Sequence, residues 1–236
     1  MSNQSIIAEP LPGMAPASAR FVRQSDFVPY EVINKTPVAV IGCGAIGREV
    51  GRMLAAIGIN EIVLIDFDTV TPTNVTTQGF KSTDVGKEKV YALEEAILEI
   101  DPNIKVHAVM DRYRPRMVLP EVVFMCVDSI VTRELIYKSL KKKGAKFVID
   151  GRMLGEVMRV LTIQLDDEDS CKKYESSIFP ESEQEPERCT AHATIYCASG
   201  AAMLMVHQFT RYMRNFPLDA DMSLNLLAGD LFPIIS

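Results

Sequence analysis

The sequence lacks the features that mark three broad classes of protein. Its formal net charge of -6 provides no basic field, so we expect no nucleic-acid partner. No apolar run approaches the roughly 20 residues that a membrane-spanning helix needs, so we expect no membrane partner. Residues 1–20 contain neither the basic region nor the sustained apolar segment of a signal peptide.

Cysteine pairs at disulfide spacing are also absent. The chain has five cysteines, an odd number, and nothing in their spacing suggests a disulfide framework. This usage is typical of a reducing compartment. Together with the missing signal peptide and membrane segment, it leads us to expect a soluble, cytoplasmic protein.

Composition and length indicate one large domain with an extension. The 236 residues are 47% hydrophobic and 24% charged, which is enough apolar material for a substantial core. Residues 1–19 are rich in Pro, Ala and Ser, and we expect a flexible N-terminal arm there. Residues 20–236 then form the folded domain.

Apolar runs rich in β-branched residues alternate with segments of helical period. We predict buried strands at 37–42, 61–68, 104–110, 121–128 and 145–150, and helices at 48–58, 85–100, 131–143 and 194–213. Asp84 is the expected N-cap of the second helix. Segment 156–165 suits an antiparallel strand, and 221–234 one or two more. The order predicts the α/β class, with a Rossmann-like, doubly wound, mostly parallel sheet and antiparallel C-terminal additions.

A glycine-rich turn follows the first predicted strand. Gly42, Gly44 and Gly47 form the G-x-G-x-x-G pattern "GCGAIG" directly before a helix. Backbone amides of such a turn can meet phosphates at the helix N-terminus. Asp66 ends the second strand about 20 residues later, where a carboxylate can accept ribose hydroxyls. These features suit NAD and ATP equally.

Polar residues further along favour ATP. Asn74, Gln78, Lys87 and Lys89 follow the ribose acid, and NAD needs no lysine for a triphosphate. Asp128 stands at the carboxyl end of the fourth strand, the edge where ligands bind in such sheets. A carboxylate at that edge can hold Mg²⁺ against phosphate oxygens. The combination predicts a site for ATP and Mg²⁺.

At this point the sequence resembles the ThiF/MoeB/HesA family and the activating enzymes of ubiquitin and its relatives. The resemblance runs from about Arg20 to Arg214. It rests on "RFVRQ", "GCGAIG", "LIDFDTVTPTN", Gln78, "DVGKEKV", "CVDSIVTR" and "EPERCT" in this order. The order and spacing of these motifs are far more specific than the glycine turn alone.

The resemblance implies a role for each matching residue. Arg23 would enter the ATP site of a neighbouring subunit, which implies a homodimer, and it would act with the metal on the charge that develops at the α-phosphate. Lys89, also expected to be catalytic, would position the triphosphate together with Asn74 and Gln78. Asp128 would bind Mg²⁺. The nucleotide-binding set comprises Gly42, Gly44, Ala45, Gly47, Asp66, Asn74, Gln78, Lys89 and Asp128.

Two departures from the family pattern change the expectations. The family usually has N-x-x-R-Q, whereas this chain reads "NVTTQ", so Thr77 replaces an arginine. Either Arg23 or another base compensates, or the site is weaker. Relatives that bind structural zinc carry two C-x-x-C pairs. Cys171 begins "CKKY" without a partner, and no pair occurs near the C-terminus. A tetrahedral thiolate site cannot be built this way, so we expect no zinc.

Cys189 lies in "EPERCT", within a polar segment at 166–190 that resembles the crossover loop of the family. It is either a structural cysteine or a nucleophile. Its polar surroundings, the adjacent Arg188 and a nearby helix start favour a reactive thiolate, although Glu185 and Glu187 oppose it. We favour the nucleophile, with Cys171 as the alternative. The remaining cysteines, Cys43, Cys126 and Cys197, suit small or core positions.

One further residue, Arg152, follows the fifth strand at the ligand edge. Two interpretations stay open for it. Its guanidinium can guide the C-terminal tail of a protein substrate, or it can form an ion pair with a nearby acid.

The expected function is ATP-dependent activation of a ubiquitin-like, β-grasp protein. The substrate's C-terminal carboxylate would be adenylated, then passed to Cys189 as a thioester and on to a conjugating enzyme. The short architecture is similar to that in bacterial ubiquitin-like conjugation operons, some of them antiviral. One alternative is adenylation of a sulfur carrier for thiamin or molybdopterin synthesis. The other is a non-catalytic Rossmann module that senses a nucleotide.

Overall fold

The computed structural model describes residues 20–178 and 194–233, with side chains up to 229. The predicted N-terminal arm and Cys189 therefore lie outside the described residues. The elements in chain order are η1 (Val22–Gln24), α2 (Tyr30–Ile33), β1 (Val38–Ile41), α3 (Ala45–Ile57), β2 (Glu61–Ile65), α4 (Pro72–Gln78), η2 (Ser82–Asp84), α5 (Lys89–Ile100), β3 (Lys105–Val109), β4 (Val122–Met125), α6 (Ile130–Lys143), β5 (Phe147–Leu154), β6 (Val157–Gln164), α7 (Glu168–Glu175), α8 (Ile195–Met213), β7 (Asp221–Asn225) and β8 (Asp230–Pro233).

These strands form one sheet in the order β3-β2-β1-β4-β5-β6-β7-β8. The pairs from β3 to β5 are parallel, and those from β5 to β8 are antiparallel. Strand β1 lies in the centre of the parallel part, and the chain leaves it in one direction to β2 and later returns to its other side at β4. The predicted mostly parallel sheet with antiparallel C-terminal additions is confirmed.

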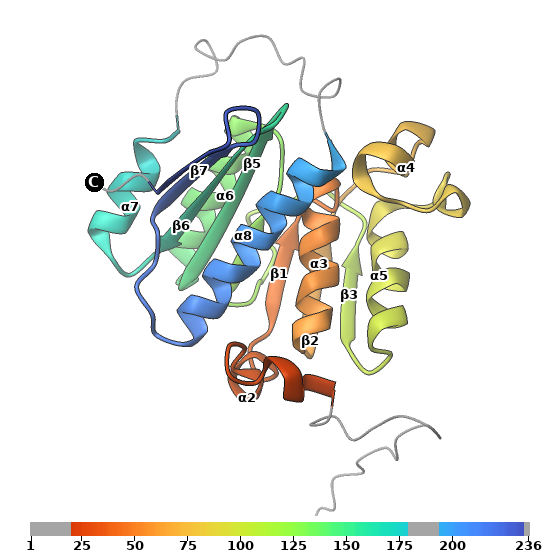
Figure 1. The fold of residues 1–236 in the computed structure, drawn as a ribbon, viewed down its shortest axis with the longest axis horizontal. Coiled ribbons are helices and arrows are strands. Elements are labelled where there is room, and N and C mark those ends of the chain that lie inside the picture. The colour runs from red at the N-terminus through yellow and green to blue at the C-terminus, as the bar shows by residue number, and fades with distance from the viewer. Residues whose placement is uncertain (1–19, 179–193, 234–236) are drawn as a thin grey trace, which may run out of the picture.

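Alternate side chains of the buried strands point to two separate cores. In β1, Val38 and Val40 join a core covered by α3, α5 and α8, while Ala39 and Ile41 join a core covered by α6 and α7. Figure 1 shows α3, α5 and α8 in front of the sheet, with α6 behind it. Burial on both faces explains why these strands are continuously apolar in sequence.

Three elements differ from the prediction in where they begin or end, and local hydrogen bonds and packing explain each difference. Asp84 does not cap α5, because its carboxylate accepts the amide of Lys81 at 2.9 Å inside η2, and the helix begins four residues later. The polar segment from 166 is not all loop, because Asp167 caps α7 and that helix packs on β6. Strand β5 continues to Leu154 and forms a hairpin with β6 around Gly155, whose φ is +61°.

None of the described helices is both long enough and apolar enough to span a membrane.

A first prediction concerns the core beneath α8. Phe209 is fully buried and packs edge-on against Phe124 of β4, with 5.5 Å between the ring centroids. We expect Phe209→Ala to lower the free energy of unfolding by about 3–5 kcal/mol, because it opens a cavity between helix and sheet. Met203→Ala is the matched control on the same helix, since that side chain is 50% exposed. Urea denaturation measures both, and equal effects would contradict the packing described.

Candidate nucleotide site

The loops at the carboxyl ends of the parallel strands bring the predicted site residues to one edge of the sheet. Gly42 follows β1, Asp66 follows β2, and Asp128 comes three residues after β4. The amide of Gly42 binds the carbonyl of Ile65 at 2.8 Å, and that of Cys126 binds Ile41 at 2.8 Å. These bonds hold three adjacent loops together.

Two positions of the glycine turn must be glycine, because neighbouring backbone atoms leave no room for a β-carbon. Gly42 has a φ of +91°, and a β-carbon there would lie 2.6 Å from the carbonyl oxygen of Cys126. A β-carbon on Gly47 would lie 1.8 Å from the carbonyl oxygen of Gly42. Gly44 is the N-cap of α3 and offers no side chain to the free amides of the first turn. The free amides of this turn, including that of Ala45, are therefore potential donors to an anion.

Asp66 is clamped between two of these loops. One carboxylate oxygen accepts the amide of Cys43 at 2.6 Å and the other accepts the amide of Asp68 at 2.8 Å. Burial raises the pKa of Asp66, and the two amides partly offset that effect. The carboxylate is thus oriented at the edge of the glycine turn, where it was predicted to meet a ribose.

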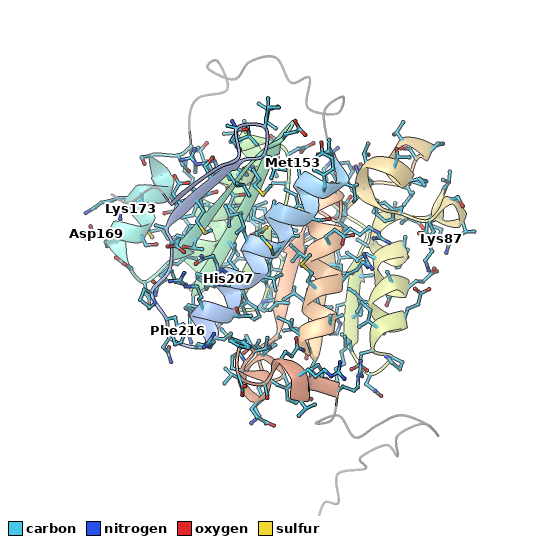
Figure 2. The ribbon with its side chains drawn as sticks, viewed as in Figure 1. Lys87, Met153, Asp169, Lys173, His207 and Phe216 are labelled. Carbon is cyan, nitrogen blue, oxygen red and sulfur yellow. The ribbon has the colours of Figure 1, made fainter. Side chains whose placement is uncertain are left out.

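Two lysines follow Asp66, and the structure separates them. Lys89 is 7% exposed, and its Nζ donates to the Asp68 carboxylate at 2.9 Å. Lys87 instead lies at the outer rim of the molecule near α5 (Figure 2), where it pairs with Glu95 at 2.6 Å. The sequence did not single out Asp68, although its D-x-D spacing from Asp66 was a signal. Asp68 holds Lys89 beside the ribose acid.

Helix α4, which the sequence reading did not predict, carries Asn74, Thr77 and Gln78. Gln78 lies over the glycine turn, with its Oε1 3.7 Å from the β-carbon position of Gly44. That oxygen is buried and has no hydrogen-bond partner among the described residues. The side chains of Asn74 and Thr77 instead bond within their own segment, to the amide of Thr71 at 2.9 Å and the carbonyl of Thr73 at 2.8 Å.

Asp128 is exposed on the loop after β4 and forms no ion pair or side-chain hydrogen bond with the residues the structure describes. The neighbouring loop is held by Arg133 of α6. Its guanidinium donates to the carbonyls of Val127 and Gly151 and pairs with the fully buried Asp150. Burial lowers the pKa of Arg133 to about 10, still far above neutrality, so the cation persists. Sequence reasoning missed this positioning residue within "CVDSIVTR".

Arg152 completes the same buried network. Its Nε donates to Asp150 at 2.8 Å, and its other nitrogens donate to the carbonyl and the hydroxyl of Ser177 at 2.9 and 3.0 Å. The hydroxyl of Tyr174 also donates to Asp150, at 3.1 Å. Of the two interpretations of Arg152, the ion pair is the one that the structure contains. The network ties α7 to the loop that bears Asp128.

Arg23 lies at the opposite end of the sheet from the other site residues. It is exposed in η1, and the adjacent Gln24 donates to the carbonyl of Ala56 near the end of α3, at 3.2 Å. The glycine turn stands at the start of that helix. Arg23 is therefore not part of the site of its own chain.

The described cysteines are poorly placed for nucleophilic chemistry. Cys43, Cys171 and Cys197 are fully buried. Burial raises the pKa of Cys126 to about 12, although this residue follows β4 at the site rather than lying within the strand. Cys171, the alternative nucleophile, is buried on α7 in this structure. Cys189 is outside the described residues, so its role stays a prediction.

The carboxylate of Asp128 is of the kind that binds magnesium. Mg²⁺ commonly binds one or two carboxylates together with substrate phosphates, and Asp128 offers one carboxylate that is unpaired among the described residues. Within residues 20–178 and 194–229, no three His, Cys, Asp or Glu side chains gather as a metal site would require. His107 pairs with Glu61, and His207 is exposed on α8 (Figure 2).

Comparison with known proteins now identifies the family. A model described as "ThiF family" matches residues 18–229. The chain belongs to the ThiF family. Molybdopterin-synthase adenylyltransferase of Escherichia coli K12 is 29% identical over 168 residues, which cover 68% of this chain and 66% of that protein. Ubiquitin-like modifier-activating enzyme 5 of Dictyostelium discoideum is 34% identical over 76 residues, 32% of this chain and 20% of its own length.

Solved structures agree on the fold of this ThiF-family chain. The crystal structure of PaaA has a TM-score of 0.73 at 19% identity and covers 94% of this chain and 84% of that one. A crystal structure of E. coli MccB with ATP has a TM-score of 0.72 at 17% identity, over 90% of this chain and 70% of that one. The chain therefore spans about two thirds of the E. coli sequence relative and a fifth of the longer activating enzyme.

A second prediction tests the close approach in the glycine turn. We expect Gly47→Ala to lower the melting temperature by several degrees and to abolish ATP binding, because its β-carbon would meet the Gly42 carbonyl at 1.8 Å. Gly51→Ala is the control on the same helix. Its β-carbon would meet only side-chain ends of Leu93 and Ile97, at 3.2 Å or more. Calorimetric titration with ATP that gave equal affinities for both variants would refute this reading of the turn.

Proposed function

We propose that this protein uses ATP to adenylate the C-terminal carboxylate of a ubiquitin-like protein. The observation that carries the proposal is the convergence of the glycine turn, Asp66, Lys89 and Asp128 at one edge of the sheet. Asp66 would hold the ribose, and the α3 amides with Gln78 would face the phosphates. The two nearby cations would be Lys89 and a magnesium ion held by Asp128.

This arrangement supplies what adenylation needs from a protein. Attack of a carboxylate on the α-phosphate expels pyrophosphate, and negative charge builds on the leaving group. A magnesium ion at Asp128 would stabilise that charge. Arg133 fixes the loop that precedes Asp128, so the metal ligand would be preorganised. Membership in the ThiF family and the adenylyltransferase among its relatives support the same reaction class.

The next step in the proposal is thioester formation on Cys189. The acyl group would leave AMP for the Cys189 thiolate and pass from there to a conjugating enzyme. The match to a ubiquitin-like modifier-activating enzyme favours this step. The match to a molybdopterin-synthase adenylyltransferase favours an alternative in which the adenylate is delivered to a sulfur donor. The two outcomes differ in whether a protein thioester forms.

The third prediction separates the two half-reactions. We expect Cys189→Ala to keep ATP–pyrophosphate exchange with the cognate β-grasp protein but to form no reductant-sensitive adduct, because adenylation needs no thiol. Asp128→Ala should lose both, because it removes the proposed metal ligand. Cys171→Ala is the matched control and should keep both, since that thiol is buried.

The measurements are radiolabelled pyrophosphate exchange and non-reducing gel electrophoresis. If Cys189→Ala still forms the adduct, the nucleophile is another residue. Exchange by the wild type without any adduct would instead support an adenylate-only activator of the sulfur-carrier kind. No exchange with any β-grasp partner would contradict the proposal itself.

We further propose a homodimer in which Arg23 reaches the site of the partner. Its place at the far end of the sheet supports a role in trans, because the same chain's site lies at the other end of α3. Exposed apolar side chains occur in η1, in α2 and in the turn between them, including Val22 at 65%, Phe27 at 69% and Val32 at 47%. Such a surface suits a subunit interface.

The fourth prediction is complementation between two inactive variants. Arg23→Ala and Asp128→Ala should each have low pyrophosphate exchange alone. Their mixture should recover up to about a quarter of wild-type exchange, because random pairing makes half of the dimers mixed and each mixed dimer has one intact site. Subunit exchange is checked by pulling down a tagged partner. Confirmed mixed dimers without recovered exchange would show that Arg23 does not act in trans.

A further inference from the structure

Arg48 is a buried cation with an unsatisfied donor beside the glycine turn. The residue is 4% exposed, and its Nε has no hydrogen-bond partner among the described residues. Buried charged groups are normally paired and fully hydrogen-bonded, because the loss of hydration otherwise costs free energy. Burial also lowers the pKa of this guanidinium. A bound anion would supply the partner that Nε lacks among the described residues.

The carboxylates nearest to Arg48 are shared with other cations. Its Nη1 pairs with Glu49 at 3.1 Å, but that carboxylate also binds Arg52 at 3.1 Å. From η2, the buried Asp84 is the other nearby acid, and it pairs with Lys87 at 3.5 Å. Two arginines thus share Glu49, and Asp84 is paired with Lys87, which also binds Glu95 at 2.6 Å. The aromatic ring of Phe80 lies 5.0 Å from the guanidinium and adds an apolar wall.

The side chain also stands where a phosphate chain would pass. The amide of Arg48 donates to the carbonyl of Gly44 at 2.9 Å, so Arg48 lies one turn into α3. Side chains on a helix lean toward its N-terminus, over the preceding turn. Nη1 lies 3.4 Å from the β-carbon position of Gly79, next to Gln78. The unpartnered donor of Arg48 and the unpartnered acceptor of Gln78 thus belong to one corner that covers the N-terminus of α3.

We propose that Arg48 binds the β- and γ-phosphates of ATP at the N-terminus of α3, as the arginine of a triphosphate subsite shared with Gln78. The inference rests on the proposed ATP-dependent function and deepens it. A guanidinium with a free donor suits phosphate oxygens, because it offers several N–H groups in a fixed plane. Arg48 would also replace the arginine that the family has at the position of Thr77. The hydroxyl of Thr77 cannot take that role, because it donates to the carbonyl of Thr73 in its own helix. A phosphate would give the guanidinium a second anionic partner besides the Glu49 that it shares with Arg52.

The test replaces Arg48 by methionine, which keeps the length and suits the contact with Phe80. We expect Arg48→Met to lower ATP affinity by about 10- to 100-fold and to change AMP affinity less than threefold, because AMP lacks the two outer phosphates. The ATP-induced rise in melting temperature should disappear, while the melting temperature without nucleotide changes little. Titration calorimetry and differential scanning fluorimetry provide these readouts.

Arg52→Met is the matched control, since Arg52 shares the same Glu49 but its side chain is 45% exposed. It should retain wild-type affinity for both nucleotides. Equal losses in the two variants, or equal losses of ATP and AMP affinity in Arg48→Met, would overturn the proposal and leave Arg48 as a structural partner of Glu49.

A second variant keeps the test decisive if Arg48→Met does not fold. Arg48→Lys retains the charge but removes the planar donor set, and we expect an intermediate loss of ATP affinity with AMP affinity unchanged. Wild-type ATP affinity in Arg48→Lys and in Arg48→Met would each contradict the proposal. Absence of ATP binding by the wild-type protein would instead refute the proposed function, so the two failures are distinguishable.

Discussion

The rest of the site depends on the two hydrogen bonds that the Asp66 carboxylate accepts from backbone amides. Its carboxylate joins the loop after β1, through Cys43, to its own loop after β2, through Asp68. Asp68 in turn holds Lys89, so one buried acid sets the position of the glycine turn, a second acid and a cation. Charge-assisted bonds of this kind are stronger than neutral ones, which partly offsets the cost of burying Asp66.

A second buried acid, Asp150, organises the other half of the sheet edge. It binds Arg133 and Arg152, and through them it fixes the loop before Asp128 and the end of α7 at Ser177. Removing one member of such a network leaves the others buried and unpaired, which is far more costly than the loss of a surface ion pair. The predicted nucleotide-binding part of the site is therefore held by Asp66, and the predicted metal-binding loop after β4 is held by Asp150.

The sequence predicted the sheet well because strands buried on both faces must be apolar throughout, a pattern that "VAVI" and "VVFM" display. It failed for α4 and α7, which are rich in Thr, Asn, Asp and Lys and owe their form to caps and tertiary contacts. Asp66 and Gln78 could be placed because motif spacing fixes them. Arg48 could not be placed, because its sequence position is that of an ordinary solvated helix residue. Its burial comes from Phe80 and Gly79, which follow α4 and lie over α3.

Arg48 and Gln78 illustrate how a binding site differs from a core. In a core, most buried polar atoms find a partner, and the free protein gains from each bond. Here a donor and an acceptor are both buried and unpartnered at one corner, which costs the free protein stability without any structural return. Local conflicts of this kind are expected where a ligand supplies the missing partner. The unsatisfied atoms therefore point to the same corner as the glycine turn, although neither observation depends on the other.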